Sequence, residues 1–190
     1  MTILREKRFG LLTNSEKPLI ASRDIPCFKV LLKIRRKYYV CPPAYNSYIQ
    51  NKYLMPKEVF SRIGPYQTGK IYRIDTSMDP EKDYRIDGEV GEGFFHTYCE
   101  LEDARKFKDY LLEKSKVNNN LYTIPRGSEL VILNSIIPKG SLYYKGDYKQ
   151  MSVMSYASNV ILYKEEVKDI RDYYYSRDPN TKKMKKIDIV

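Results

Sequence analysis

The chain has 190 residues, the length of one domain of ordinary size, and carries 34 Lys and Arg against 24 Asp and Glu, a net charge of +10. Hydrophobic residues make up 42% of it, which is enough for a core and excludes wholesale disorder. The composition also excludes collagen-like, coiled-coil and disulfide-scaffold proteins, and no apolar run approaches the roughly 18 residues that a membrane span needs.

The first regular elements form a predicted β-hairpin. In residues 28–34, apolar side chains alternate with Lys29 and Lys33, a pattern that is typical of a half-buried strand. Residues 37–41 predict the antiparallel partner of this strand, and the prolines that follow end it because proline cannot donate to a strand ladder. The basic residues between the two strands are therefore expected at the turn.

A strand and a helix are predicted in the middle of the chain. A strand over residues 70–75 is followed by an acidic loop, whose spacing fails the calcium-loop pattern and therefore indicates a solvated loop. A strand over 93–98 leads into a helix over 100–115, and a capping box that begins at Thr97 is expected to start this helix. The apolar stripe of the helix consists of Leu101, Ala104, Phe107 and Leu111.

An internal repeat separates the later strands. Residues 124–128 read Ile-Pro-Arg-Gly-Ser and residues 137–141 read Ile-Pro-Lys-Gly-Ser, which is the chemistry of a turn because Pro fixes φ and Gly accepts a positive φ. Strands are expected over 121–124, 129–137, 142–144 and 159–163. Apolar residues at helical spacing then predict a terminal helix over 164–176.

These elements predict an α+β fold, with mainly antiparallel sheet and two principal helices in a single compact domain over residues 1–176. Residues 1–24 are a possible N-terminal arm, and residues 177–190 form a basic C-terminal tail.

The positive charge lies at the two ends of the chain. Residues 1–40 contain ten Lys and Arg and three Asp and Glu, residues 41–175 contain 19 of each, and residues 176–190 contain five and two. Charge that is confined in this way indicates a polyanionic partner more than a general solubility charge does.

The candidate RNA-binding residues combine cations with tyrosines, since tyrosine stacks on bases while cations hold phosphates. Alternation along the strand sends Tyr38 and Tyr39 to opposite faces, so that one joins the core and the other is free to stack. The full set is Lys33, Arg35, Arg36, Lys37, Tyr38 and Tyr39 at the hairpin and Lys182, Lys183, Lys185 and Lys186 in the tail. Solvated lysines without a partner are the alternative for both clusters.

Cysteine and histidine counts predict neither a metal nor a cofactor. The three cysteines, Cys27, Cys41 and Cys99, are odd in number and form no CxxC pair, so free thiols in a reducing cytoplasm are expected. His96 is the only histidine, which excludes a histidine metal cluster. No sequence pattern of a catalytic triad or a phosphate-binding loop is present.

Three segments resemble uncharacterised small proteins of Bacteroidetes and of their phages and mobile elements. They are residues 17–30, residues 93–98 and residues 136–144, together with Tyr156-Ala157-Ser158. The resemblance implies an accessory gene whose product binds and blocks host machinery, including RNA-guided (CRISPR-type) defence, in the cytoplasm of a bacterial host.

A shorter stretch resembles the ADP-ribosyltransferase superfamily. Residues 93–97, Gly-Phe-Phe-His-Thr, and the helix segment that begins at Ala104 are similar to a strand and helix of that family. The family carries a catalytic glutamate on a later strand, whereas residues 156–162 here contain no acid before Glu165. The resemblance therefore implies a related fold with altered chemistry, in which His96 would contact a nicotinamide nucleotide.

The sequence thus favours a non-enzymatic binding protein that engages RNA or an RNA–protein complex and is a candidate anti-defence, anti-CRISPR factor. An ADP-ribosyltransferase-like enzyme or pseudo-enzyme is the first alternative, and a virion or other structural interaction protein is the second. A host protein is a possible partner, and no membrane partner is expected.

Overall fold

The computed structural model describes residues 10–34, 38–42, 64–74, 77–91, 93–116, 124, 127–148 and 152–168. Their strands are β1 (Leu11–Leu12), β2 (Leu19–Ile20), β3 (Ile25–Ile34), β4 (Tyr38–Val40), β5 (Ile71–Arg73), β6 (Glu89–Val90), β7 (Phe95–Tyr98), β8 (Glu129–Ile137), β9 (Leu142–Tyr148), β10 (Val153–Ser158) and β11 (Val160–Glu166), and their helix is α3 (Leu101–Lys116). Strands account for 48% of the described residues and helix for 13%. The fold is therefore mostly antiparallel sheet, and the predicted α+β class with two helices is wrong.

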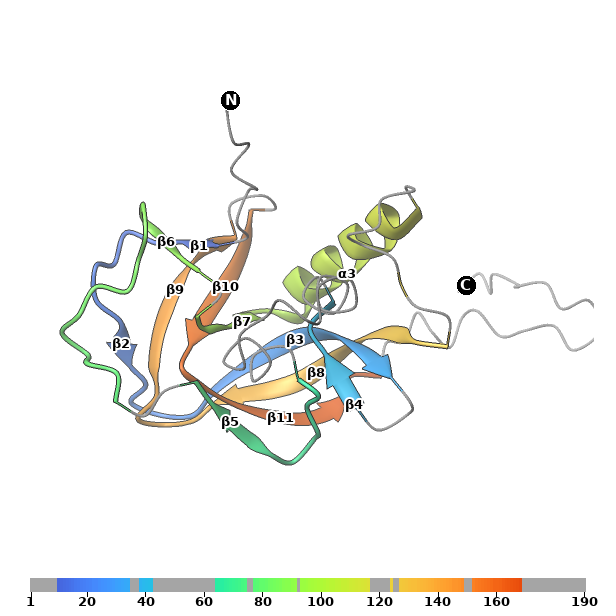
Figure 1. The fold of residues 1–190 in the computed structure, drawn as a ribbon, viewed down its shortest axis with the longest axis horizontal. Helices are drawn as coiled ribbons and strands as arrows, with labels where there is room; N and C mark the ends of the chain where they lie inside the picture. Colours follow the sequence, from blue (N-terminus) through green and yellow to red (C-terminus); the bar gives the residue numbers. More distant parts are fainter. Residues whose placement is uncertain are drawn as a thin grey trace, which may run out of the picture.

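The strands form one bent sheet in the order β5-β11-β8-β3-β7-β10-β9-β1-β6, with β2 added to β9 and β4 added to β3. Figure 1 shows β9 and β10 running up one side of the molecule, while β3, β8 and β11 cross below them and α3 lies above. The sheet bends where β10 passes into β11, because β10 pairs with β7 and β9 whereas β11 pairs with β8 and β5.

Asn159 holds this bend together. It is the single residue between β10 and β11, and it is buried. Its side-chain Oδ1 accepts a hydrogen bond from the backbone N–H of Leu142 at 2.9 Å, and its backbone carbonyl accepts one from Ile74 at 3.0 Å. The side chain of Asn159 therefore fixes the start of β9 to the bend, and its backbone carbonyl fixes the residue that follows β5.

Strand β3 is buried on both faces. Val30 and Leu32 pack into the core beneath α3, and Cys27 and Leu31 pack into a second core on the opposite face. The predicted half-buried strand is therefore wrong in one respect, since its lysine-bearing face is partly covered. Tyr39 and Tyr66 belong to the cluster on that face.

The helix agrees with its predicted stripe but not with its predicted cap. Ala104, Phe107 and Leu111 are buried against Val30 and Leu32 of β3. The described start of α3 is Leu101, and the N–H of Ala104 donates to the carbonyl of Glu100. Thr97 lies within β7, so the strand takes the residue that the capping box would use as its N-cap.

The predicted terminal helix over 164–176 is wrong in its described part, because Lys164 to Glu166 complete β11. Tyr163 pairs with Ser135 and Glu166 pairs with Leu133, and the register shifts between these two pairs. An extra residue of this kind breaks the period of two along a strand. The apolar spacing beyond Tyr163 then resembles helical spacing, although pairing with β8 decides the conformation.

The turn chemistry of the repeat is confirmed. Gly127 and Gly140 have φ of 82° and 84°, and the N–H of Ser141 donates to the carbonyl of Pro138 at 3.1 Å. The predicted strand over 129–137 has the bounds of β8. Strand β10 is not among the predicted strands, and residues 121–123, 169–176 and 177–190 lie outside the described residues.

The described part of the proposed N-terminal arm contributes two strands. Leu11 and Leu12 pair with both β6 and β9, and Leu19 and Ile20 pair with the other end of β9. Residues 10–24 are thus joined to the sheet by backbone pairing.

Candidate nucleic-acid interface

The candidate interface begins with a hairpin. Strands β3 and β4 pair in antiparallel register, Leu32 with Val40, Lys33 with Tyr39 and Ile34 with Tyr38. Only three residues separate the last paired residues, and these are the predicted phosphate contacts Arg35, Arg36 and Lys37. They lie outside the described residues, as do Lys182, Lys183, Lys185 and Lys186 of the tail.

Tyr39 anchors the base of this hairpin. The side chain is 7% exposed and belongs to the core that covers Leu31. Its backbone N–H donates to the carbonyl of Tyr66 at 3.1 Å, and the N–H of Tyr66 donates back at 2.7 Å. Its hydroxyl donates to Glu166 Oε1 at 2.7 Å. Tyr39 is therefore a structural residue, and its ring is not available to stack on a base.

Lys33 meets the same carboxylate. Its Nζ lies 2.5 Å from Glu166 Oε1, and the two side chains are 26% and 32% exposed. Partial burial alone would raise the pKa of Glu166, but hydrogen bonds from Lys33 and Tyr39 hold it below its usual value. Burial, together with Glu166, raises the pKa of Tyr39. At neutral pH Glu166 is therefore a carboxylate and Tyr39 a neutral phenol.

The structure divides the described hairpin residues into two groups. Lys33 and Tyr39 are engaged by Glu166, whereas Tyr38 is half-buried on the opposite face of β4. The opposite orientation of the two tyrosines agrees with the predicted alternation. Across β3 and β8, Lys33 also pairs in register with the exposed Glu129. The base of the hairpin carries balanced charge, so the excess cations of this region are those beyond Ile34.

His96 lies on β7, away from the hairpin. Its ring Nε2 donates to the carbonyl of Gly91 at 2.9 Å, and its ring meets Tyr148 edge to face with centroids 6.3 Å apart. Burial and, to a smaller extent, the nearby Lys29 lower the pKa of His96 to about 4, so the imidazole is neutral at pH 7. Its Nδ1 is buried and has no hydrogen-bond partner among the described residues.

Three other features concern the predicted classes of site. Within the ranges that the structure describes, no group of three or more His, Cys, Asp or Glu side chains is placed to hold a metal ion. Cys27, Cys41 and Cys99 are free thiols. None of the helices in those ranges is long and apolar enough to cross a membrane.

Two residues that matter at this site were not identified from the sequence. Glu166 binds Lys33 and Tyr39 but follows them by more than 120 residues, and the sequence places it in a helix. Lys29 was assigned only to the polar face of a strand, although its neighbours on that face are buried. The one usable signal was the apolar run over 160–163, which is typical of a strand and brings Glu166 onto that strand if it is extended by three residues.

Comparison with known proteins adds no relative: no family model matches this chain, and no curated protein or solved structure does.

Proposed function

We propose that the protein is a non-enzymatic RNA-binding protein, which contacts RNA or an RNA–protein complex through the end of the β3–β4 hairpin. One observation carries the proposal. The connection between the paired Ile34 and Tyr38 consists entirely of Arg35, Arg36 and Lys37, and it is held on a base fixed by Glu166.

The short connection concentrates charge. Three cations in three residues, next to a charge-balanced base, give a local excess that attracts phosphates without desolvating the protein. Tyr38 follows them directly and is half-buried, so part of its side chain remains accessible to a ligand. Base–tyrosine stacking of this kind contributes about 1–3 kcal/mol for each base.

The base of the hairpin supports the interface without touching RNA. Since Glu166 neutralises Lys33, a phosphate would have to displace a carboxylate to reach it. Since Tyr39 is 7% exposed, stacking on it would require the core to open. The proposed contacts are therefore Arg35, Arg36, Lys37 and Tyr38, with the tail lysines as a second cation cluster.

The test is the salt dependence of RNA binding, measured by fluorescence anisotropy with a single-stranded and a structured RNA. The double variant Arg35→Ala, Arg36→Ala should bind more weakly, and its slope of log K against log salt should flatten by about 1.4 for the single strand, or 0.7 for each lost contact. We expect its melting temperature to be unchanged, because charge substitutions at a turn usually change stability by no more than about 0.5 kcal/mol.

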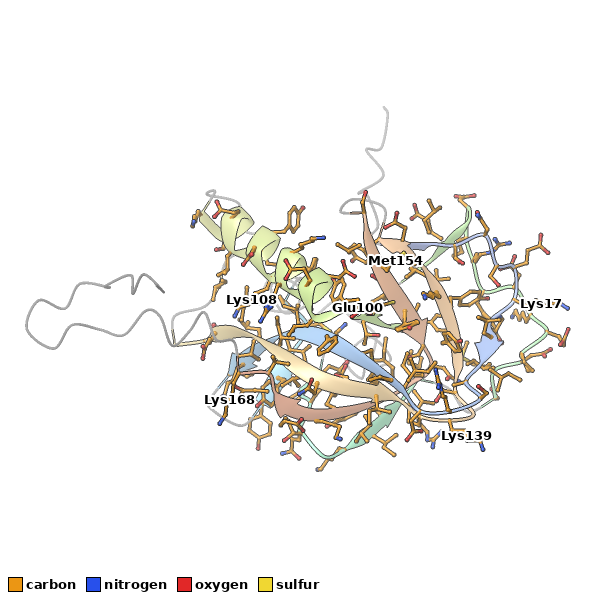
Figure 2. All side chains as sticks on the ribbon, turned by 180° about the vertical axis from the view of Figure 1, so that it is seen from behind. Lys17, Glu100, Lys108, Lys139, Met154 and Lys168 are labelled. Atoms are coloured by element: carbon orange, nitrogen blue, oxygen red, sulfur yellow. The ribbon has the colours of Figure 1, made fainter. Side chains whose placement is uncertain are left out.

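A matched control removes the same charge elsewhere. Arg23 and Lys139 are exposed near the start of β3, which is about 30 Å of strand away from the hairpin end. Figure 2 shows Lys139 at the turn between β8 and β9. Arg23→Ala, Lys139→Ala should keep the affinity and the slope. Equal losses in both double variants would mean that only net charge matters. No binding by the unmodified protein at low salt would reject the RNA proposal and favour a protein partner.

The biological setting of the proposal comes from the resemblance to phage accessory proteins alone. In that setting the partner is a guide RNA or its complex with a host protein, and binding blocks defence. Inhibition of RNA-guided cleavage by the unmodified protein, lost in Arg35→Ala, Arg36→Ala but kept in Arg23→Ala, Lys139→Ala, is the expected result.

A further inference from the structure

Four strands place a row of polar side chains on one face of the sheet. Phe28 pairs with Tyr98, so the antiparallel register puts Lys29 of β3 next to Thr97 of β7. Thr97 pairs with Tyr156 of β10, which pairs with Lys145 of β9. Since Val30 and Tyr98 pack under α3, this row lies on the face that points away from the helix.

Lys29 is the unusual member of the row. It is half-buried, and within the described ranges the one hydrogen bond of its side chain is donated from Nζ to the carbonyl of His96 at 2.5 Å. It forms no ion pair with any described residue, in contrast to Lys33. An ammonium has three donors, and a half-buried charge without a counter-ion is unfavourable. Two of its donors are therefore left for a ligand or for water.

The surroundings of Lys29 carry further polar groups. Thr97 is fully buried beside the Cys27 thiol, which its hydroxyl contacts, so it forms a wall of the row and does not contact a ligand. At the other end of the row, Lys145 Nζ lies 5.9 Å from the ring centroid of Tyr156, which is half-buried. Polar groups that are partly buried are normally satisfied, so a half-buried ammonium with two unused donors indicates a missing acceptor.

From this juxtaposition we infer that the row is a binding site for a phosphate group, with Lys29 as its anchoring cation and Lys145 as a second cation at its rim. The ligand supplies what the protein lacks here, namely negative charge and hydrogen-bond acceptors. A tetrahedral phosphate has enough oxygens to accept from both unused donors of Lys29. A free phosphate and the phosphate of a nucleotide share this chemistry, although only the nucleotide offers a ring to Tyr156. The inference is independent of the proposed RNA contact.

Isothermal titration calorimetry distinguishes these ligands, with inorganic phosphate and adenosine monophosphate as the probes and sodium chloride at matched ionic strength as the blank. Direct heats are preferred to melting temperatures, because phosphate stabilises many proteins by exclusion from their surface. Lys29→Met should weaken binding by about tenfold or more, the loss expected for one charge-assisted hydrogen bond. Lys139→Met, an exposed lysine outside the row, should bind within about twofold of the unmodified protein.

The melting temperature of Lys29→Met without ligand provides a second test, which does not depend on whether this variant binds phosphate. Without ligand this variant should melt at the same or a higher temperature, because a residue of similar shape removes a half-buried charge that has no counter-ion. A folded Lys29→Met protein with unchanged phosphate affinity overturns the inference, as does a lack of binding of either probe by the unmodified protein. A lower melting temperature also counts against it, since Lys29 would then be structural.

The two proposals fail separately. Arg35→Ala, Arg36→Ala should bind phosphate like the unmodified protein, and Lys29→Met should keep the salt slope of RNA binding. Tighter binding of the nucleotide than of phosphate supports a nucleotide ligand. Equal binding supports free phosphate, and either result supports the site.

Discussion

Two lysines on the same face of β3 have opposite electrostatic surroundings. Lys33 lies 2.5 Å from the carboxylate of Glu166, which also accepts from Tyr39, so charge and hydrogen bonds are matched there. Lys29, four residues earlier on the strand, has a backbone carbonyl as its described acceptor and no described carboxylate partner. Strand, face and residue type are the same, so the difference comes from the strands that pack beside each lysine.

The comparison indicates which basic residues of a sheet hold the fold and which are available to ligands. A cation that is already paired contributes to stability and has little left for a polyanion. A cation that is half-buried and unpaired lowers stability and retains its capacity for a ligand. By this criterion Lys33 belongs to the scaffold, although the sequence groups it with Arg35, Arg36 and Lys37.

The largest expected effect is on acidification, which should destabilise the surroundings of Lys29 at a higher pH than those of Lys33. His96, whose carbonyl accepts from Lys29, has a pKa of about 4 against a usual 6.5, so the unfolded chain binds more protons between these values. Stability from this group is complete above pH 6.5 and is lost as the pH falls toward 4, by up to about 3 kcal/mol. The Glu166 end has a lowered pKa and loses its contribution only below pH 4.5.

Urea unfolding at pH 7, 5.5 and 4 measures this loss. His96→Gln keeps a donor for the carbonyl of Gly91 but does not titrate, so its stability should change much less over the same range. If His96→Gln loses as much stability as the unmodified protein between pH 7 and 5.5, then His96 is not the group that titrates.

Removal of the shared carboxylate should have the next largest effect. Glu166→Ala leaves Lys33 and Tyr39 without their acceptor, and we expect a loss of about 2 kcal/mol, the range for hydrogen bonds to charged groups. The midpoint of urea unfolding should fall without a change of slope, because the folded state remains compact.

The neighbouring Glu165 is the matched control. Its carboxylate accepts a hydrogen bond from Asn134 at 3.0 Å at an exposed position. The midpoint of urea unfolding of Glu165→Ala should therefore lie close to that of the unmodified protein. Equal destabilisation by Glu165→Ala and Glu166→Ala would show that the charge of β11 matters and that the hairpin anchor does not.

Local patterns predicted the local elements of this fold. The alternation over 28–34, the stripe on residues 101–111 and the turn at Gly140 each specify structure within a few residues, and the structure has β3, α3 and a turn at these places. Strand β10 was missed because its buried face includes the small residues Ser155 and Ala157, so the sequence lacks the alternation of large apolar and polar residues that indicates a strand.

The site was less predictable, because its contacts are made between distant strands. Nothing near Lys33 in the sequence indicates that Glu166 will neutralise it, and the bulge after Tyr163 made that segment resemble a helix. The opposite orientation of Tyr38 and Tyr39 was predictable, because it follows from the period of a strand. Pairing partners across the sheet follow from topology, which the sequence alone did not give.

The smallest effect tests the two tyrosines of the hairpin against each other. Tyr39→Phe removes one hydroxyl that donates to Glu166 at 2.7 Å and keeps the buried ring, so the expected loss is about 1 kcal/mol. This loss should be smaller than the loss in Glu166→Ala, because Lys33 still pairs with the carboxylate. Water can also replace the lost hydroxyl, since the Glu166 side chain is 32% exposed. Tyr38→Phe, on the opposite face, should leave the unfolding midpoint unchanged. Both variants should bind RNA like the unmodified protein, since a phenylalanine ring stacks as tyrosine does. A larger loss in Tyr38→Phe than in Tyr39→Phe would reverse the assignment of scaffold and contact faces, and the anchoring of the hairpin would then have to come from the other side of β4.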